Sequence, residues 1–117
     1  MNSRTMLLSG SILGALSVAF GAFGAHMLES SLSAEDLAIF ETGVRYQMYH
    51  ALALLLCANL SRGAGFAAHG FLWGTVVFSG SLYLLVLTDA RWLGAITPIG
   101  GTLLIIGWIV LILRSLK

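Results

Sequence analysis

The chain has 117 residues, of which 58% are hydrophobic and only 9% are charged. A soluble domain carries roughly 25% charged residues, so this composition excludes an ordinary soluble protein and indicates a membrane protein. A net charge of +1 provides no basic surface for nucleic acid. The chain is short and has no linker or low-complexity tract, so we expect residues 1–117 to form a single transmembrane domain.

Four apolar stretches, separated by short charged segments, predict four transmembrane helices. A helix needs about 20 apolar residues to cross the bilayer. On this basis we place the spans at approximately residues 5–28, 37–61, 66–88 and 92–113. Short connections make consecutive spans antiparallel neighbours, so the expected fold is a compact, all-α, antiparallel four-transmembrane-helix bundle.

The first span carries small residues on one face. Gly10, Gly14 and Gly21 fall within one stripe of the helix. Such stripes let helix backbones approach each other closely in lipid. The stripe predicts close packing against another helix of the same chain. The alternative is a contact face for a second copy or for a larger membrane complex.

The second span begins with a helix-start signal and then becomes unusually polar. Ser33, followed by Asp36 at the third position, is typical of a helix N-cap, so we expect a helix to begin near Ala34. The uncharged part of the span runs only from Tyr46 to Ser61, which is short for a crossing of about 20 residues. Arg45 is therefore expected at or inside the outer edge of the membrane.

A cluster of polar residues occupies one half of this second helix. Thr42, Glu41, Arg45, Tyr49 and His50 share that half with Tyr46. We expect this half to face inward at the outer side of the bundle. An unpaired arginine in a membrane is costly, so we also expect an ion pair between Arg45 and Glu41, four residues before it. An acid from another segment, Asp89 or Glu29, is the alternative partner.

The last two spans show further packing signals. Gly70 and Gly74 are four residues apart in the third span, and Gly94 and Gly101 are seven apart in the fourth. Both spacings place the two glycines on one helix face, so we expect close helix contacts there. Pro98 removes a backbone hydrogen bond inside the fourth span. We therefore expect the last helix to be broken near Pro98.

Three roles are open for the polar cluster. The first is a binding or passage site for a small polar molecule or a lipid headgroup, formed by Glu41, Arg45, Tyr46, Gln47, Tyr49 and His50 together with His26. The second is a hydrogen-bonded core in a purely structural accessory subunit. The third is a haem-binding or redox subunit in which His26 and His50 ligate the iron.

No motif for catalysis or for a metal is present in the sequence. A metal site needs three or four converging ligands, and the spacing of the His, Cys and acidic residues does not provide them. Nucleotide loops, nucleophile elbows and paired catalytic carboxylates are also missing. The single cysteine, Cys57, cannot form an intramolecular disulfide and is expected to be a small buried side chain. We therefore expect no cofactor, no metal and no catalytic residues, which favours a protein that is not an enzyme.

The distribution of basic residues predicts the orientation in the membrane. Arg4, Arg62, Arg114 and Lys117 fall before the first span, between the second and third, and after the fourth. Basic residues in short loops are retained in the cytoplasm. We therefore expect a protein of the cytoplasmic (inner) membrane, multi-pass, with both termini in the cytoplasm.

Several segments resemble the signature sequences of a small membrane-protein family. These are residues 21–26 (GAFGAH), 42–53 (TGVRYQMYHALA), 78–83 (FSGSLY) and 94–101 (GAITPIGG). The family is domain-of-unknown-function family 423, which is similar to the transmembrane protein 256 family. The resemblance runs from the first span to the last. It implies a small multi-pass protein, in bacteria of the cytoplasmic membrane, with no established activity.

Overall fold

The computed structural model describes residues 1–60 and 64–117, and all regular elements in these residues are helical. They are, in order, α1 (Ser3–Ala19), the π-helical turn η1 (Phe20–Gly24), α2 (Ala25–Leu28), α3 (Ala34–Asn59), α4 (Ala64–Thr88), the 3-10 turn η2 (Arg91–Ala95) and α5 (Thr97–Ser115). The turn predicted at residues 61–63, and with it the cytoplasmic position of Arg62, lies outside the described residues.

Three helical segments are long and apolar enough to span a membrane. They are Ser3–Leu28, Ala64–Thr88 and Arg91–Ser115. α3 has 26 residues, but its polar first half keeps it out of this group. The all-helical class is therefore confirmed, and a membrane crossing by α3 stays a prediction.

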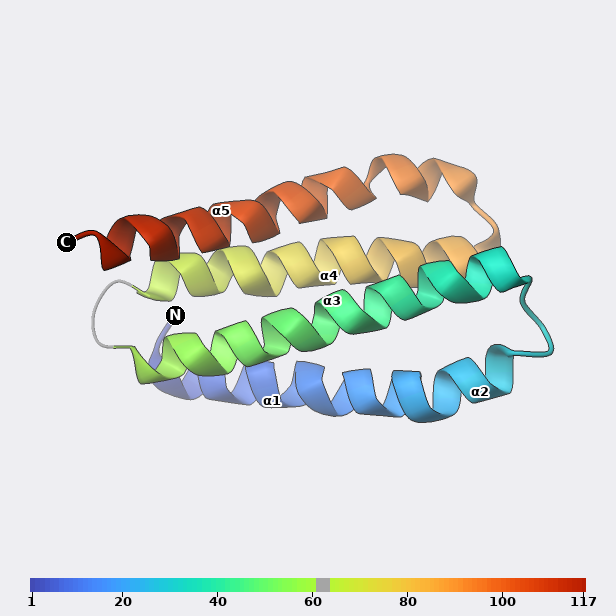
Figure 1. The fold of residues 1–117 in the computed structure, drawn as a ribbon, viewed down its shortest axis with the longest axis horizontal. Helices are drawn as coiled ribbons and strands as arrows, with labels where there is room; N and C mark the ends of the chain where they lie inside the picture. The colour runs from blue at the N-terminus through green and yellow to red at the C-terminus, as the bar shows by residue number, and fades with distance from the viewer. Residues whose placement is uncertain (61–63) are drawn as a thin grey trace.

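The helices lie in a row. α1 packs on α3, α3 on α4 and α4 on α5, and within the described residues no contact of similar extent joins α1 to α5. Figure 1 shows this order from bottom to top, with both termini at one end. The Cα atoms extend over 49 × 26 × 18 Å. The compact bundle expected from the sequence is therefore not confirmed, because α1 and α5 do not pack against each other as neighbouring helices do.

The glycine stripe of α1 packs against α3. A methyl group at Gly10 would lie 2.9 Å from the carbonyl oxygen of Ala51, so only glycine allows this approach. Gly14 also faces Ala51, and Gly21 faces Val44. The stripe thus serves packing within the chain, which is the first of its two predicted uses. α3 of the same chain buries Gly10 and half-buries Gly14, whereas Gly21 is exposed, so association with other chains stays a prediction.

Glycines also bring α4 and α5 together. Methyl groups at Gly70 and Gly74 would lie 2.9 Å from the carbonyl oxygen of Leu103 and 2.7 Å from the side chain of Leu104. In α5, the closest approach to α4 is at Gly100 and not at Gly101, the residue selected by the seven-residue spacing. Spacing alone identified the right segment but the wrong one of two adjacent glycines.

Pro98 lies in the first turn of α5 and does not break it. The 3-10 turn η2 ends at Ala95, and α5 begins at Thr97 and continues without interruption through Gly100. The first turn of a helix tolerates proline, because its N–H groups have no partner within the helix. The interruption expected near Pro98 therefore lies at Ile96, two residues before the proline, where the 3-10 turn ends and α5 follows.

Local signals at the start of α3 and in the core act as predicted. The Ser33 hydroxyl accepts a hydrogen bond of 3.1 Å from the Asp36 N–H, so α3 begins at Ala34. Cys57 is buried, with 1% of its surface exposed, in an apolar cluster with Leu54 and Phe71. Cys57 is thus the small buried side chain that the sequence predicts.

Candidate functional site

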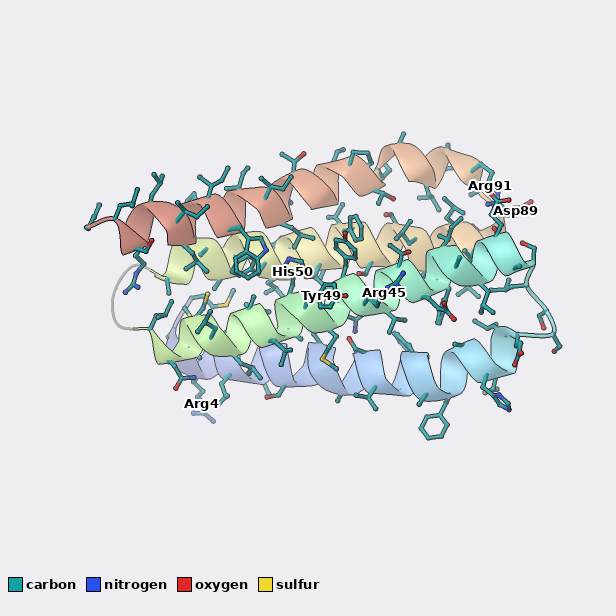
Figure 2. The ribbon with its side chains drawn as sticks, viewed as in Figure 1. Arg4, Arg45, Tyr49, His50, Asp89 and Arg91 are labelled. Atoms are coloured by element: carbon teal, nitrogen blue, oxygen red, sulfur yellow. The ribbon has the colours of Figure 1, made fainter. Side chains whose placement is uncertain are left out.

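The polar cluster of α3 is split between two faces of the helix. Gln47 and His50 are buried, whereas Glu41, Arg45 and Tyr49 are exposed. Figure 2 shows Arg45, Tyr49 and His50 in succession along α3, between Asp89 and Arg91 at one end and Arg4 toward the other. The prediction that the whole cluster faces inward is therefore wrong.

Close helix contacts explain which residues of α3 face inward. A methyl group at Gly43 would lie 2.8 Å from the ring of Tyr83, so α4 approaches α3 at Gly43. The buried side of α3 accordingly contains Phe40, Gly43, Gln47 and Leu54. Small and amide side chains fit this contact, whereas a buried charge would lose its solvation without compensation. The charged residues of α3 therefore remain on its outer side.

Gln47 joins three helices through hydrogen bonds. Its amide nitrogen donates to the carbonyl oxygen of Leu13 in α1 at 2.9 Å. Its amide oxygen accepts from the Tyr83 hydroxyl in α4 at 2.6 Å. One turn away, the Ser79 hydroxyl donates to the carbonyl oxygen of Gly43 at 2.7 Å. Both ends of the Gln47 amide are therefore used for helix packing.

His50 is held in one tautomer by its two partners. Its Nδ1 lies 2.7 Å from the carbonyl oxygen of Tyr46, and its Nε2 lies 3.0 Å from the indole nitrogen of Trp108. A carbonyl can only accept and an indole N–H can only donate. Nδ1 therefore carries the hydrogen and Nε2 accepts, which describes a neutral imidazole with both nitrogens occupied.

Arg45 and Glu41 do not form the predicted ion pair. The Arg45 guanidinium instead donates a hydrogen bond of 3.4 Å to the Thr42 hydroxyl. The other proposed partners are also engaged elsewhere: Asp89 pairs with Arg91, and Glu29 lies 3.8 Å from the ring nitrogen of His26. Within the described residues, Arg45 therefore has no carboxylate partner.

The two histidines proposed as haem ligands are far apart. His26 is exposed beside Glu29, whereas His50 is buried against Trp108. Gly24 faces Phe40, and His26 lies two residues further from His50 in the antiparallel helix pair, so the two histidines are about 18 Å apart along α3. One iron cannot be ligated by both side chains, and the haem hypothesis based on this pair is wrong. No group of three His, Cys, Asp or Glu residues suited to a metal occurs in the described part of the chain.

A groove of about 490 Å³ runs beside the exposed part of the cluster. α3 and α5 form its walls, and Phe78 of α4 lies between them. Its lining consists of Tyr46, Tyr49, His50, Phe78, Gly101, Leu104, Ile105 and Trp108. The Tyr46 and Phe78 rings are 4.8 Å apart, so aromatic surface dominates one side. Because both nitrogens of His50 are occupied, the groove presents a mainly apolar lining.

Charged groups link α3 to the α4–α5 connection at the end opposite the termini (Figures 1 and 2). The Arg91 guanidinium donates to both carboxylate oxygens of Asp36, at 2.9 and 3.0 Å, and also contacts Asp89. These hydrogen bonds lower the pKa of the Asp36 carboxyl below its usual value. Asp89 occupies the left-handed region, with φ of 58°, where an aspartate is tolerated better than most residues.

Sequence reasoning missed the partners contributed by α4 and α5. Ser79, Tyr83 and Trp108 were not selected as site residues, because each looks like an ordinary residue of an apolar span. Ser79 and Tyr83 are four residues apart and therefore share a helix face. This spacing of two hydroxyls within a span was the available signal for an inward polar face of α4.

Comparison with known proteins identifies the family. The model of DUF423, a protein family of unknown function, matches residues 20–101. A UPF0382 membrane protein of Staphylococcus epidermidis, SERP0230, is 46% identical over 97% of both chains. The UPF0382 membrane protein YwdK of Bacillus subtilis is 42% identical over 97% of this chain and 98% of its own length. The UPF0382 inner membrane protein YgdD of Escherichia coli is 38% identical over 100% of this chain and 93% of its own.

No solved structure matches the chain. The family model covers more than half of the sequence, and these relatives match it almost from end to end. The chain therefore belongs to the DUF423 family and is a multi-pass membrane protein.

Proposed function

We propose that this protein crosses the cytoplasmic membrane four times as an antiparallel helical layer and binds a phospholipid in the groove between α3 and α5. In this proposal the lipid phosphate contacts Arg45, and an acyl chain lies against Tyr46, Tyr49 and Phe78. Gln47 and His50 hold the helices together. The site is therefore a lipid-binding surface and not a passage through the layer.

The distribution of charge supports the four crossings. Arg4 and Arg114 belong to the end where both termini lie (Figure 1), and Asp36, Asp89 and Arg91 belong to the other end. The length of 49 Å exceeds a hydrocarbon core of about 30 Å, which leaves about 10 Å at each end for the headgroup regions. Under the positive-inside rule the end with the termini faces the cytoplasm.

The depth of Arg45 supports a headgroup contact. Arg45 lies about 14 Å along α3 from Asp36, which belongs to the polar end. Its Cα is therefore only about one helical turn inside the edge of the hydrocarbon core, and its long side chain can reach the headgroup region. A guanidinium binds phosphate with two parallel hydrogen bonds. A lipid phosphate would supply the negative partner that the described residues do not.

The position of the guanidinium connects the headgroup contact to the groove, and this single observation carries the proposal. Thr42, Tyr46 and Tyr49 share one face of α3. The Arg45 guanidinium donates to the Thr42 hydroxyl and so leans toward this face, on which Tyr46 and Tyr49 line the groove. A volume of about 490 Å³ lies within the range of ligand pockets, about 300–1,000 Å³.

Filling the groove tests the proposal. A methyl group at Gly101 would lie 3.7 Å from the Phe78 ring, so Gly101→Leu fits and places its side chain in the groove. A methyl group at Gly80 has no neighbour within 4 Å, which makes Gly80→Leu the matched control. Phosphatidylglycerol and phosphatidylethanolamine retained by the purified protein are measured by native mass spectrometry. We expect Gly101→Leu to reduce the retained lipid and Gly80→Leu to leave it unchanged; equal retention by both variants contradicts the proposal.

The arginine is tested in the same way. Arg45→Gln should reduce lipid retention about fivefold, since charged hydrogen bonds contribute about 1 kcal/mol near an interface. Arg4→Gln removes the same charge from the other end of the molecule and should change retention by less than about twofold. Equal effects of the two substitutions would mean that positive charge attracts lipids without a specific site.

The orientation requires a separate measurement. In a Cys57→Ala background, single cysteines at Ser31 and Ser115 are exposed to a membrane-impermeant maleimide in intact cells. We expect labelling at Ser31 and none at Ser115 until the cells are opened. Labelling of Ser115 from outside would overturn the proposed orientation.

A further inference from the structure

We propose that the phospholipid is a zwitterionic aminophospholipid, whose phosphate contacts Arg45 and whose primary ammonium contacts Glu41. This inference rests on the proposed function and adds the chemical class of the ligand. It follows from the relative position of the two charged side chains, from their freedom to bind and from the charge of the surrounding surface.

Both side chains are available to a ligand. Glu41 and Arg45 are exposed on the outer face of α3, and they do not pair with each other. In the described part of the chain, no ion pair is formed by the Glu41 carboxylate. The two groups are nevertheless separated by only one helical turn, so one small headgroup can contact both.

The order of the two charges matches an aminophospholipid. Glu41 lies about 6 Å closer than Arg45 to the end that carries Asp36 and Arg91. Under the proposed orientation this direction leads out of the membrane. In a phospholipid the acyl chains are deepest, the phosphate is next and the ammonium is nearest to water. Along α3, the groove is deepest, Arg45 is next and Glu41 is nearest to the outer end, which is the same order of depth.

The surrounding charges disfavour an anionic lipid. Glu41 shares this end of the molecule with Glu35, Asp36 and Asp89, and Arg91 is already paired with Asp36 and Asp89. A headgroup with a net negative charge would meet this acidic surface and be repelled. A primary ammonium instead donates hydrogen bonds to a carboxylate, whereas a quaternary ammonium has no N–H to donate.

The test compares three lipids with the purified full-length protein. Palmitoyl-oleoyl phosphatidylethanolamine, phosphatidylglycerol and phosphatidylcholine are titrated separately in detergent, and binding is measured by native mass spectrometry. We expect phosphatidylethanolamine to bind about threefold more tightly than the other two. Glu41→Gln should remove this preference. Glu35→Gln, which removes the same charge from the exposed first turn of α3, should retain it.

The outcomes separate this inference from the proposed function. If wild-type protein binds phosphatidylglycerol or phosphatidylcholine as tightly as phosphatidylethanolamine, or if Glu41→Gln keeps the preference, the assignment of the headgroup is overturned. In those cases a loss of binding in Arg45→Gln still supports the lipid site. If Arg45→Gln binds all three lipids as wild type does, the proposed site and the inference fail together.

Discussion

Replacing Gly100 with alanine should force α4 and α5 apart. The added methyl group would lie 2.3 Å from the backbone nitrogen of Phe78 and 2.7 Å from its Cα. Because both atoms belong to the backbone, rotation of a side chain cannot relieve the contact. An ordinary contact begins at 3.4 Å, so the two helices must separate by about 1 Å at this point.

The expected loss in the free energy of unfolding combines two destabilising effects with one stabilising effect. Overpacking of a close contact costs about 1–3 kcal/mol and occasionally more. A separation of about 1 Å also weakens neighbouring contacts, because a gap of this size removes a quarter to a half of each dispersion contact. Gly70 and Gly74 lie in the same interface and share this loss. Alanine gains about 1 kcal/mol of helix propensity over glycine, so we expect a net destabilisation of about 2 kcal/mol or more.

The adjacent glycine provides the control. A methyl group at Gly101 would be no closer than 3.7 Å to the Phe78 ring, which is an ordinary contact. Gly101→Ala should therefore change the free energy of unfolding by between zero and about 1 kcal/mol in the stabilising direction. The free energy is measured from titration with sodium dodecyl sulfate in mixed micelles, followed by circular dichroism. If the two variants agree within about 0.5 kcal/mol, the close approach of α4 to α5 at Gly100 is refuted.

Three further predictions concern polar groups. Gln47→Leu and Tyr83→Phe should each lower the free energy of unfolding by about 1–2 kcal/mol, because each change leaves a buried partner without its hydrogen bond. The double variant should therefore lose less than the sum of the two single losses. Additive losses in a double-mutant cycle would mean that the two side chains do not interact. Hydrogen bonds from Arg91 lower the pKa of Asp36, so their contribution to the free energy of unfolding should be complete above the unfolded-state pKa of about 3.9. This contribution should disappear as the pH falls through the lower folded-state pKa. The free energy of unfolding, measured between about pH 6 and pH 3, should show this loss in wild type and less of it in Asp36→Asn. The buried Thr75 hydroxyl has no hydrogen-bond partner in the described part of the chain, so Thr75→Val should be neutral or stabilising by up to about 1 kcal/mol, and a clear loss of stability would reveal a partner.

Local signals in the sequence predicted the start of α3 and the packing use of glycine. Ser33 caps α3 through a hydrogen bond to a residue only three positions later in the sequence. The stripe of small residues that includes Gly10 follows directly from the helical repeat. Pro98 predicted an interruption of the last span, and the change from the 3-10 turn η2 to α5 lies two residues before it. A proline further inside a helix interrupts that helix, whereas a proline in the first turn is accommodated.

The expectation that the polar cluster faces inward was wrong for most of its residues, and its role as a binding site stays a prediction. Glu41, Arg45 and Tyr49 share a helix face with His50 on a wheel, yet only His50 is buried among them. A wheel divides a helix into two halves without identifying the one that contacts other helices. That choice depends on Gly43 and Gln47 meeting Tyr83, a residue far away in the sequence.

The sequence by itself determined that this protein belongs in a membrane, that it is helical and that charge collects at particular boundaries, because hydropathy, caps and charge are properties of short segments. Only the tertiary structure decided that α1 and α5 remain apart and that the amide of Gln47 is used for packing. These features depend on distances between side chains on different helices. Such distances follow from the simultaneous packing of all four long helices, which no single segment of the sequence specifies.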